Sequence, residues 1–358
     1  MLADSSKEGS VELHRSIGSL VDEWDGLADR MRTSPFLRPH WFSLLTRAFG
    51  GRTLVLALRQ DGRLVAVLPL RRLRGGLASM TNEHTPEFGL LSENEEAAYA
   101  LAQGLFSLCP RYLALRYLDD VGASMRSLRK AAAEARYRVI VGESERQPYV
   151  VVDGDWERYE RSLKAKMRRD LRRRRRQLEE QGALSLDVQD GRQRLTALLE
   201  EGFGLEPSGW KEVRRTAIRS RPETHRFYSE LAEWSAERGI LRLSFLRLDG
   251  RPLAFQYGLE DGGMYYFLKG GYDPAYARFA PARLLIYGLL ERAFSIGLRR
   301  YDFLGAPEAF KLEWTERLRN LKRLEAFAPK ATASTAWAAV AYGRPVARRV
   351  RRVARRLR

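Results

Sequence analysis

Residues 269–285 read KGGYDPAYARFAPARLL, a polar segment rich in glycine and aromatic residues that leads directly into an apolar helical pattern. Pro281 stands where the first helical residue is expected, and its ring fixes the helical φ angle. The amides of Ala282, Arg283 and Leu284 then lack intrahelical acceptors and carry partial positive charge. Such a helix start can bind phosphate, with Arg283 as a charged donor. The alternative is an ordinary strand-to-helix junction.

The sequence around this segment predicts a meander, a helix and a further strand. Residues 241–273 contain three β-rich runs, and Asp249-Gly250 and Asp261-Gly262-Gly263 are typical hairpin turns between them. The apolar helix is expected over 281–296, ended by Gly297. Upstream we predict one helix from 156 to 181, a strand at 183–189 and helices at 192–206 and 223–239.

The first 145 residues alternate helices and strands in a degenerate version of the same order, with a hairpin at Asp61-Gly62. We therefore predict an α+β fold built from two tandem units with mixed, mostly antiparallel sheets flanked by helices. The expected boundaries are 1–146 and 147–328, followed by a basic helical tail at 329–358.

Two segments account for nearly all of the net charge of +18. KAKMRRDLRRRRR (164–176) contributes +8, and residues 329–358 contribute +9. The remainder of the chain is nearly neutral. The charge pattern therefore predicts a neutral globular body that carries two basic segments.

No stretch approaches the roughly 20 consecutive apolar residues of a membrane-spanning helix. The first 30 residues lack the apolar core of a signal peptide. Cys109 is the sole cysteine, which fits a reducing compartment. We expect a cytoplasmic protein.

Several motifs resemble one family when taken together. The longest is LKGGYDPAYARFAPARLLIYGLLERAFSIGLRRYDFLGAPEAFKLEWT (268–315). The others are SPFLRPHWF (34–42), VAVLPL (65–70), KAKMRRDLRRRRRQLEEQG (164–182), SGWK (208–211), HRFYSELAEWSAERG (225–239) and LDGRPLAF (248–255). In order and spacing, over about residues 20–328, the chain resembles the CelD-like acetyltransferases of the GNAT superfamily. That family is related to the Fem-type peptidoglycan aminoacyltransferases.

The resemblance implies a tandem GNAT-like fold whose second unit holds the better preserved site. Acetyl-CoA or another acyl-CoA is the implied co-substrate, and no metal is implied. The pyrophosphate would lie at Phe279, Ala280, Ala282, Arg283 and Leu284, while the strand at 265–269 would line the pantetheine. FAPAR stands where GNAT enzymes usually carry Gln/Arg-x-x-Gly-x-Gly/Ala. Fem-type relatives use aminoacyl-tRNA, so both donors remain open.

Acyl transfer to an amine needs a neutral amine, a polarised thioester carbonyl and a protonated leaving thiolate. YDFLG and E-x-x-K-x-x-W match the family pattern and point to Glu308 as acid/base and Lys311 as a polarising or anion-binding cation. The alternative for that pair is a solvated i,i+3 ion pair. Asp302 is a further catalytic candidate or a carboxylate that caps the following loop. Phe310 stands where relatives carry Tyr, so Tyr272, Tyr276 or solvent must supply the acid.

Five further side chains are candidates for binding. Lys269 lies at the strand end beside the expected phosphate site, and Trp210 and Lys211 lie in a loop where an acceptor would enter. His84 belongs to the loop TNEHTPEFG, and Trp314 belongs to the E-x-x-K-x-x-W motif. Ordinary structural or solvated roles are the alternatives for Lys269, Trp210, Lys211 and His84. The four histidines and one cysteine show no metal-ligand spacing, and no Walker loop or nucleophile elbow occurs.

The basic segments suggest anionic partners. The arginine run flanks an apolar stripe, and its candidate ligands are CoA phosphates, a polyanionic acceptor, tRNA or lipid headgroups; the alternative is a solvated helix face. In the tail, Val346, Val350, Val353 and Leu357 share one helical face among arginines. This pattern favours an anionic membrane surface, with a disordered solubilising tail or nucleic-acid binding as alternatives.

The sequence therefore predicts a cytoplasmic N-acyltransferase that moves an acyl group from acyl-CoA to an amino group. The resemblance makes that amine part of a sugar or an envelope/exopolysaccharide precursor, either a small molecule or a glycan- or lipid-linked acceptor. The tail would hold the enzyme at the inner membrane face. A Fem-like aminoacyl-tRNA-dependent transferase and a non-catalytic nucleic-acid-binding protein on the same scaffold are the alternatives.

Overall fold

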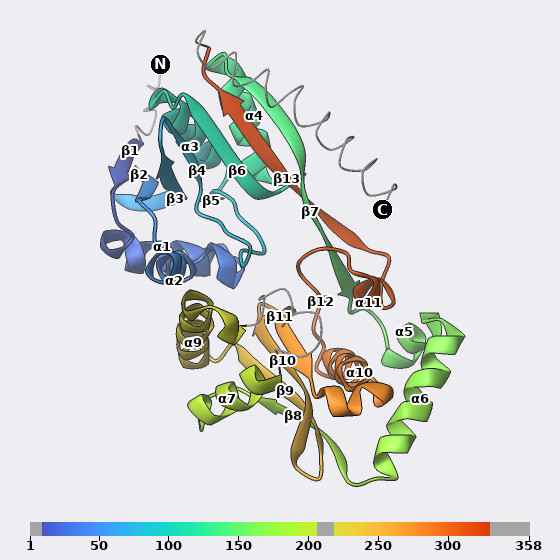
Figure 1. Ribbon diagram of the computed structural model, residues 1–358. Coiled ribbons are helices and arrows are strands. Elements are labelled where there is room, and N and C mark those ends of the chain that lie inside the picture. Colours follow the sequence, from blue (N-terminus) through green and yellow to red (C-terminus); the bar gives the residue numbers. More distant parts are fainter. Residues whose placement is uncertain (1–8, 206–217, 330–358) are drawn as a thin grey trace, which may run out of the picture. The chain divides into compact units, whose positions relative to one another are not determined.

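The computed structural model describes residues 9–205 and 218–329 and divides into two compact units (Figure 1). Unit 1 comprises the described residues of 9–46, 50–145 and 320–329, and unit 2 those of 47–49, 146–205 and 218–319. Each unit contains a mixed sheet with helices packed against it, in keeping with the predicted α+β class.

In unit 1 the sheet order is β1-β2-β3-β4-β6-β13, with β5 paired to β3. β4 and β6 are parallel, and the crossover between them contains α3. The elements are β1 (Ser10–His14), α1 (Val21–Arg30), α2 (Pro39–Phe49), β2 (Thr53–Gln60), β3 (Arg63–Leu73), β4 (Gly76–Ser79), β5 (Leu91–Ser92), α3 (Glu95–Ser107), β6 (Tyr112–Asp119), α4 (Ala123–Glu134), β7 (Arg138–Val151) and β13 (Leu318–Phe327).

In unit 2 the order is β8-β9-β10-β11-β12-β7, and β11 and β12 form the parallel pair. Helix α10 packs against β9, β10 and β11 on one face, and α7 covers the other face (Figure 1). The elements are α5 (Trp156–Ser162), α6 (Ala165–Glu179), β8 (Leu184–Gln189), α7 (Leu195–Leu205), α9 (Pro222–Glu237), β9 (Leu241–Leu248), β10 (Arg251–Asp261), β11 (Met264–Tyr272), α10 (Pro281–Ser295), β12 (Arg300–Asp302) and α11 (Ala309–Leu312). Short 3-10 helices η3 (Ile218–Ser220) and η4 (Pro274–Phe279) precede α9 and α10.

The predicted hairpins are confirmed. Leu248 pairs with Arg251 across Asp249-Gly250, whose φ angles of 48° and 80° are both left-handed. Such a two-residue turn matches the twist of the strands it joins, and an Asp-Gly pair tolerates it at low cost. Gly297, at φ 67°, ends α10 as expected.

Two predicted elements differ from the structure. The helix expected over 156–181 breaks into α5 and α6, because the backbone at Leu163 is extended (φ −67°, ψ 151°). Leu163 and the α6 residues Met167 and Leu171 are still buried in one cluster. The last strand, which the sequence placed in the second unit, pairs through its residues 321–327 with β6 of unit 1. Because β13 and β6 lie far apart along the chain, their pairing cannot be predicted from the local sequence of either strand.

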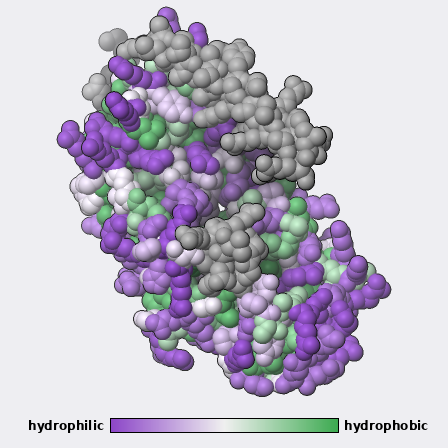
Figure 2. Space-filling view, viewed as in Figure 1, coloured by the Kyte–Doolittle hydropathy of each residue, from purple (hydrophilic) through white to green (hydrophobic). Residues whose placement is uncertain are grey.

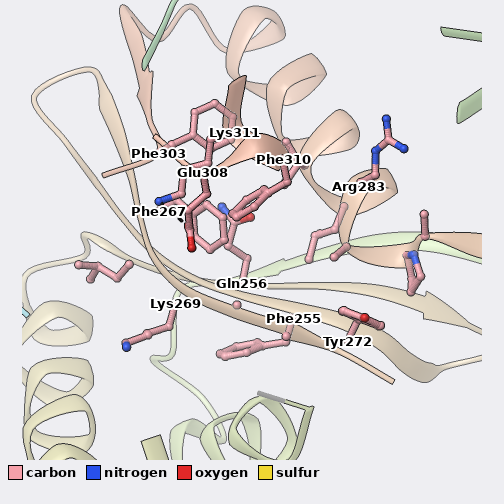
Figure 3. Close-up of a pocket in the computed structure, with 18 of the residues that line it drawn as sticks. Phe255, Gln256, Phe267, Lys269, Tyr272, Arg283, Phe303, Glu308, Phe310 and Lys311 are labelled. Carbon is pink, nitrogen blue, oxygen red and sulfur yellow. Dashed lines mark ion pairs between the residues drawn. The ribbon is translucent and has the colours of Figure 1, made fainter. Parts of the chain in front are cut away.

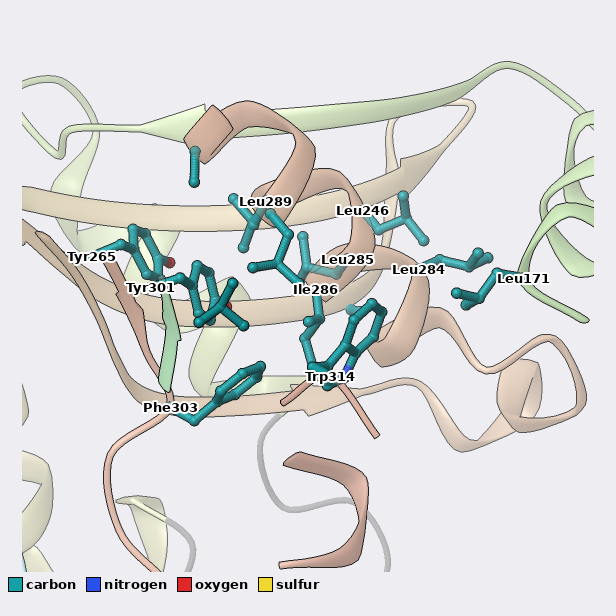
Figure 4. Close-up of a cluster of buried hydrophobic side chains, with 14 of the residues drawn as sticks. Leu171, Leu246, Tyr265, Leu284, Leu285, Ile286, Leu289, Tyr301, Phe303 and Trp314 are labelled. Atoms are coloured by element: carbon teal, nitrogen blue, oxygen red, sulfur yellow. The ribbon is translucent and has the colours of Figure 1, made fainter. Parts of the chain in front are cut away.

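The core of unit 2 fixes the start of α10. Leu284, Leu285 and Leu289 are buried against the sheet, Leu171 of α6 and Trp314 (Figure 4). Burying such a side chain is worth about 1.5–3 kcal/mol. The first turn of α10 is therefore held firmly where β11 and β12 diverge.

Candidate functional site

The site lies where two parallel strands separate. β11 pairs with β12 only over Met264–Tyr266, and then continues to Tyr272 while β12 ends at Asp302. A cavity of about 520 Å³ lies beside the freed part of β11 (Figure 3). Its lining consists of 267–272 of β11, 280–283, 285 and 286 of α10 and its cap, and Phe255, Gln256, Ala277, Phe303, Glu308, Phe310 and Lys311.

A bulge in β11 lies on the cavity wall. Tyr257 pairs with Lys269, but Gly258 pairs with Phe267, so Leu268 stands without a ladder partner on β10. A bulge of this kind breaks the regular ladder and re-aims the backbone locally. Leu268 lines the cavity at this bulge.

The start of α10 is built differently from the prediction. Ala280 caps the helix in the left-handed conformation (φ 50°, ψ 53°), and its carbonyl accepts from the amides of Arg283 (3.0 Å) and Leu284 (3.2 Å). Those two amides are therefore not available, contrary to expectation. Among the described residues, the amide of Ala282 has no acceptor. One backbone donor, rather than three, remains at this end of the cavity.

Arg283 lines the cavity and is already paired with carboxylates. Its guanidinium lies 2.9 Å from Glu313 and 3.7 Å from Asp170. In Figure 3 it points away from Glu308 and Phe310. An incoming anion would share this guanidinium with two acids.

Glu308 and Lys311 form the charged pair of the cavity, with Oε2 and Nζ 3.2 Å apart. Lys311 is 7% exposed, and its Nζ also donates to the carbonyls of Leu304 (2.8 Å) and Ala306 (3.2 Å). Leu304 and Gly305 both have left-handed φ angles, 50° and 58°. The ammonium therefore holds this tight loop and Glu308 in place, which is a positioning role.

Sequence reasoning missed Gln256. This buried side chain lines the cavity and donates from Nε2 to the hydroxyls of Tyr265 (3.1 Å) and Tyr301 (2.5 Å). Burial raises the pKa of Tyr265 to about 12, so its hydroxyl stays protonated at neutral pH. The signal available in the sequence was that Gln256 is a polar residue within an otherwise apolar stretch of a predicted strand. The aromatic lining residue Phe255 was missed as well, whereas Phe267 belongs to the strand 265–269 that was expected to line the donor.

Four predicted residues lie in the core rather than on the cavity surface. Phe279, Leu284 and Trp314 are buried in the hydrophobic cluster, because their apolar side chains pack under α10. Asp302 is fully buried; it accepts from the amide of Leu304 (2.9 Å) and lies 3.4 Å from Arg300. Its contacts match the alternative of a carboxylate that caps the loop.

The other predicted residues are spread over the chain. Lys269 and Tyr272 line the cavity, but Nζ of Lys269 lies 5.5 Å from the ring of Tyr228 and points away from Glu308 (Figure 3). His84 lies in unit 1, where its amide donates to Asn82. Trp210, Lys211 and the basic tail lie outside the described residues.

Within 9–205 and 218–329, no cluster of three or more His, Cys, Asp or Glu side chains is arranged to hold a metal ion. In the same ranges no helix is both long and apolar enough to span a bilayer.

Comparisons with known proteins agree with this geometry. Residues 165–312, which contain the whole cavity, match the family model described as an acetyltransferase (GNAT) domain. No curated protein matches the chain. The match of residues 165–312 to this model supports an acyltransferase.

Three solved structures have a similar fold. The C-terminal domain of a protein from Agrobacterium fabrum named as a lysylphosphatidylglycerol synthetase has a TM-score of 0.54 at 14% identity, over 90% of this chain and 95% of that one. FemX gives 0.57 at 13% identity, over 88% and 96%. A Bacteroides thetaiotaomicron protein of unknown function gives 0.56 at 12%, over 86% and 97%. The likeness covers both units and concerns the fold.

Proposed function

We propose that this protein transfers an acetyl or other acyl group from acyl-CoA to an amine, in the cavity where β11 leaves β12. One observation carries the proposal: a bulged strand edge and a helix start without a side-chain cap line the same cavity. The first can polarise a carbonyl, and the second can receive a phosphate.

The donor would lie along the freed part of β11. A main-chain amide at the Leu268 bulge would donate to the thioester oxygen, and the aromatic wall would exclude water from the thioester arm. The pyrophosphate would meet the Ala282 amide and Arg283. Arg283 would then exchange part of its pairing with Glu313 for the phosphate, a charge-for-charge replacement.

Glu308 is the proposed general base. It would accept a proton from the amine while the amine nitrogen bonds to the thioester carbon and the carbon–sulfur bond breaks. The pairing with Lys311 keeps the Glu308 carboxylate in position. Phe310 has no hydroxyl, so the leaving thiolate would take its proton from solvent or from Tyr272, which also lines the cavity.

The cavity has wall residues on both faces of the sheet. Phe255 faces Gly202 of α7, while Gln256 bonds to Tyr265 and Tyr301 on the α10 side. Donor and acceptor could therefore approach from opposite faces. The resemblance to CelD-like enzymes makes the acceptor an amino group on a sugar or on an envelope/exopolysaccharide precursor. The basic tail would keep the enzyme at the inner membrane face.

Replacing Glu308 by Gln tests the proposal. We expect kcat to fall about 100-fold, because general-base catalysis commonly contributes 10²–10⁴, while KM for acetyl-CoA stays within about twofold. Thiol release with a panel of amino sugars measures both constants. Glu316→Gln is the matched control, since that exposed carboxylate does not line the cavity. Full activity in Glu308→Gln would remove Glu308 from the mechanism.

A second candidate is Fem-like transfer from aminoacyl-tRNA. The observation that favours it is the exposed arginine surface of α6, where the side chains of Arg172, Arg173 and Arg175 are 61%, 60% and 53% exposed. Transfer from charged tRNA, with none from acetyl-CoA, would support this alternative.

A further inference from the structure

A second cavity of about 610 Å³ adjoins the start of α10, and Arg283 lines both cavities. We call it the basic pocket; its walls are Lys164, Lys166, Met167, Arg169, Asp170, Arg173, Arg174, Arg283 and Glu313. Hydrophilic side chains crowd the surface over α6 in Figure 2, and that helix contributes most of the pocket. The proposed acyl-CoA mechanism does not use this pocket beyond Arg283.

The pocket carries a strong positive charge. Six of its residues are basic and two are acidic, which gives a net +4. Lys164, Lys166 and Arg169 have no acidic partner among the described residues. Three exposed cations are therefore free to bind an anion.

Asp170 organises the rest of the pocket. It accepts from Nη2 of Arg173 and Nε of Arg174, both at 2.7 Å, and lies 3.7 Å from Arg283. Burial acts to raise the pKa of Asp170, but the hydrogen bonds from these two arginines outweigh it, so the pKa is lowered and the carboxylate stays ionised. Arg174 also donates to the carbonyl of Arg278 in η4. Two guanidinium groups are thus held in fixed directions.

We propose that the basic pocket binds a phosphate monoester on the nucleotide part of the donor, the 3′-phosphate of CoA. This inference rests on the proposed function, which puts the pyrophosphate at the start of α10. A monoester carries a charge of about −1.5 to −2 at pH 7, whereas a backbone phosphodiester carries one negative charge. Cations gathered around one pocket, which shares Arg283 with the acyl cavity, fit the first better than an extended RNA strand.

The test is calorimetric titration of the full chain with CoA, dephospho-CoA and adenosine 3′,5′-bisphosphate. We expect CoA to bind about tenfold more tightly than dephospho-CoA, about 1.4 kcal/mol. Arg169→Gln should abolish this preference and leave dephospho-CoA binding unchanged. Arg176→Gln is the matched control: it removes the same charge from an exposed position of α6 that does not line the pocket. It should keep both affinities within about twofold.

The outcomes separate this inference from the proposed function. Equal affinity for CoA and dephospho-CoA, or equal losses in Arg169→Gln and Arg176→Gln, would overturn the pocket assignment while leaving acyl-CoA as donor. Binding of adenosine 3′,5′-bisphosphate that depends on Arg169, without any binding of CoA, would support the pocket and overturn the donor. Binding of tRNA alone, weakened alike by both variants, would overturn both.

Discussion

The two units use the same connection, two parallel strands joined by a helix, and start that helix in opposite ways. In unit 1, α3 follows Asn94, whose Oδ1 accepts from the Ala97 amide at 2.8 Å, and Glu95 and Glu96 occupy the first turn. In unit 2, α10 follows Ala280, which offers no side-chain cap, and its first turn has no acid. At the start of α3 the Asn94 side chain satisfies a backbone amide and the two acids repel anions. The start of α10 has neither feature, so it attracts anions.

The strands that precede these two helices also differ: only the strand before α10 leaves an edge free for a ligand. β4 ends at Ser79, one residue after its last pair with β6, so no strand edge is left free beside α3. β11 runs beyond its last pair with β12 and carries a bulge on that stretch. The two units therefore differ in their capacity to bind a ligand because of a few residues at the end of the strand and at the helix cap. Catalysis by unit 2 alone follows as an expectation.

The strongest way to break this comparison is to make the α10 start acidic. Arg283→Glu puts a third carboxylate beside Asp170 and Glu313 and removes the guanidinium from both cavities. We expect acetyl-CoA affinity to fall about 100-fold, or about 2.7 kcal/mol. Calorimetric titration measures the change, with thermal unfolding as a check on folding. Glu95→Gln in α3 is the control and should leave the affinity unaltered. Wild-type affinity in Arg283→Glu would show that phosphate does not bind at this helix start.

Local signals were enough for much of the fold. Asp249-Gly250 predicts its hairpin because the turn needs two left-handed residues, and Pro281 marks the start of α10 because its φ angle suits a first helical turn. The break at Leu163 carries neither Pro nor Gly. Each of α5 and α6 packs against α10, and such packing cannot be read from the local sequence.

The site was predictable to a smaller extent. Glu308, Arg283 and Ala282 were placed on the cavity through the motif and the cap. The sequence could not tell that Lys311 is buried, because its i,i+3 spacing from Glu308 is equally typical of a surface ion pair. Trp314 packs in the hydrophobic cluster, and Asp302 caps a loop. Both structural roles depend on contacts that form only in the folded chain, so the sequence could not reveal them.

A second variant, in unit 1, tests whether the start of α3 has only a structural role. Asn94→Ala removes the cap that satisfies the Ala97 amide, which typically costs about 1 kcal/mol. We expect a lower urea midpoint for unfolding, and no change in acetyl-CoA affinity because α3 is not a ligand site. Weaker donor binding in this variant, at full folding, would mean that the helix start in unit 1 also contributes to binding.

The smallest expected effect comes from Ala280, the cap of α10. A residue with a Cβ atom pays a steric cost in the left-handed region, and glycine does not. Ala280→Gly should therefore raise the free energy of unfolding by about 0.5 kcal/mol, less than the strain alone because glycine gains entropy in the unfolded chain. Urea denaturation gives the sign, and the backbone acceptor for Arg283 and Leu284 is retained. Lower stability would mean that the Ala280 methyl group makes a contact worth more than its strain. The two helix starts would then differ in packing as well as in capping.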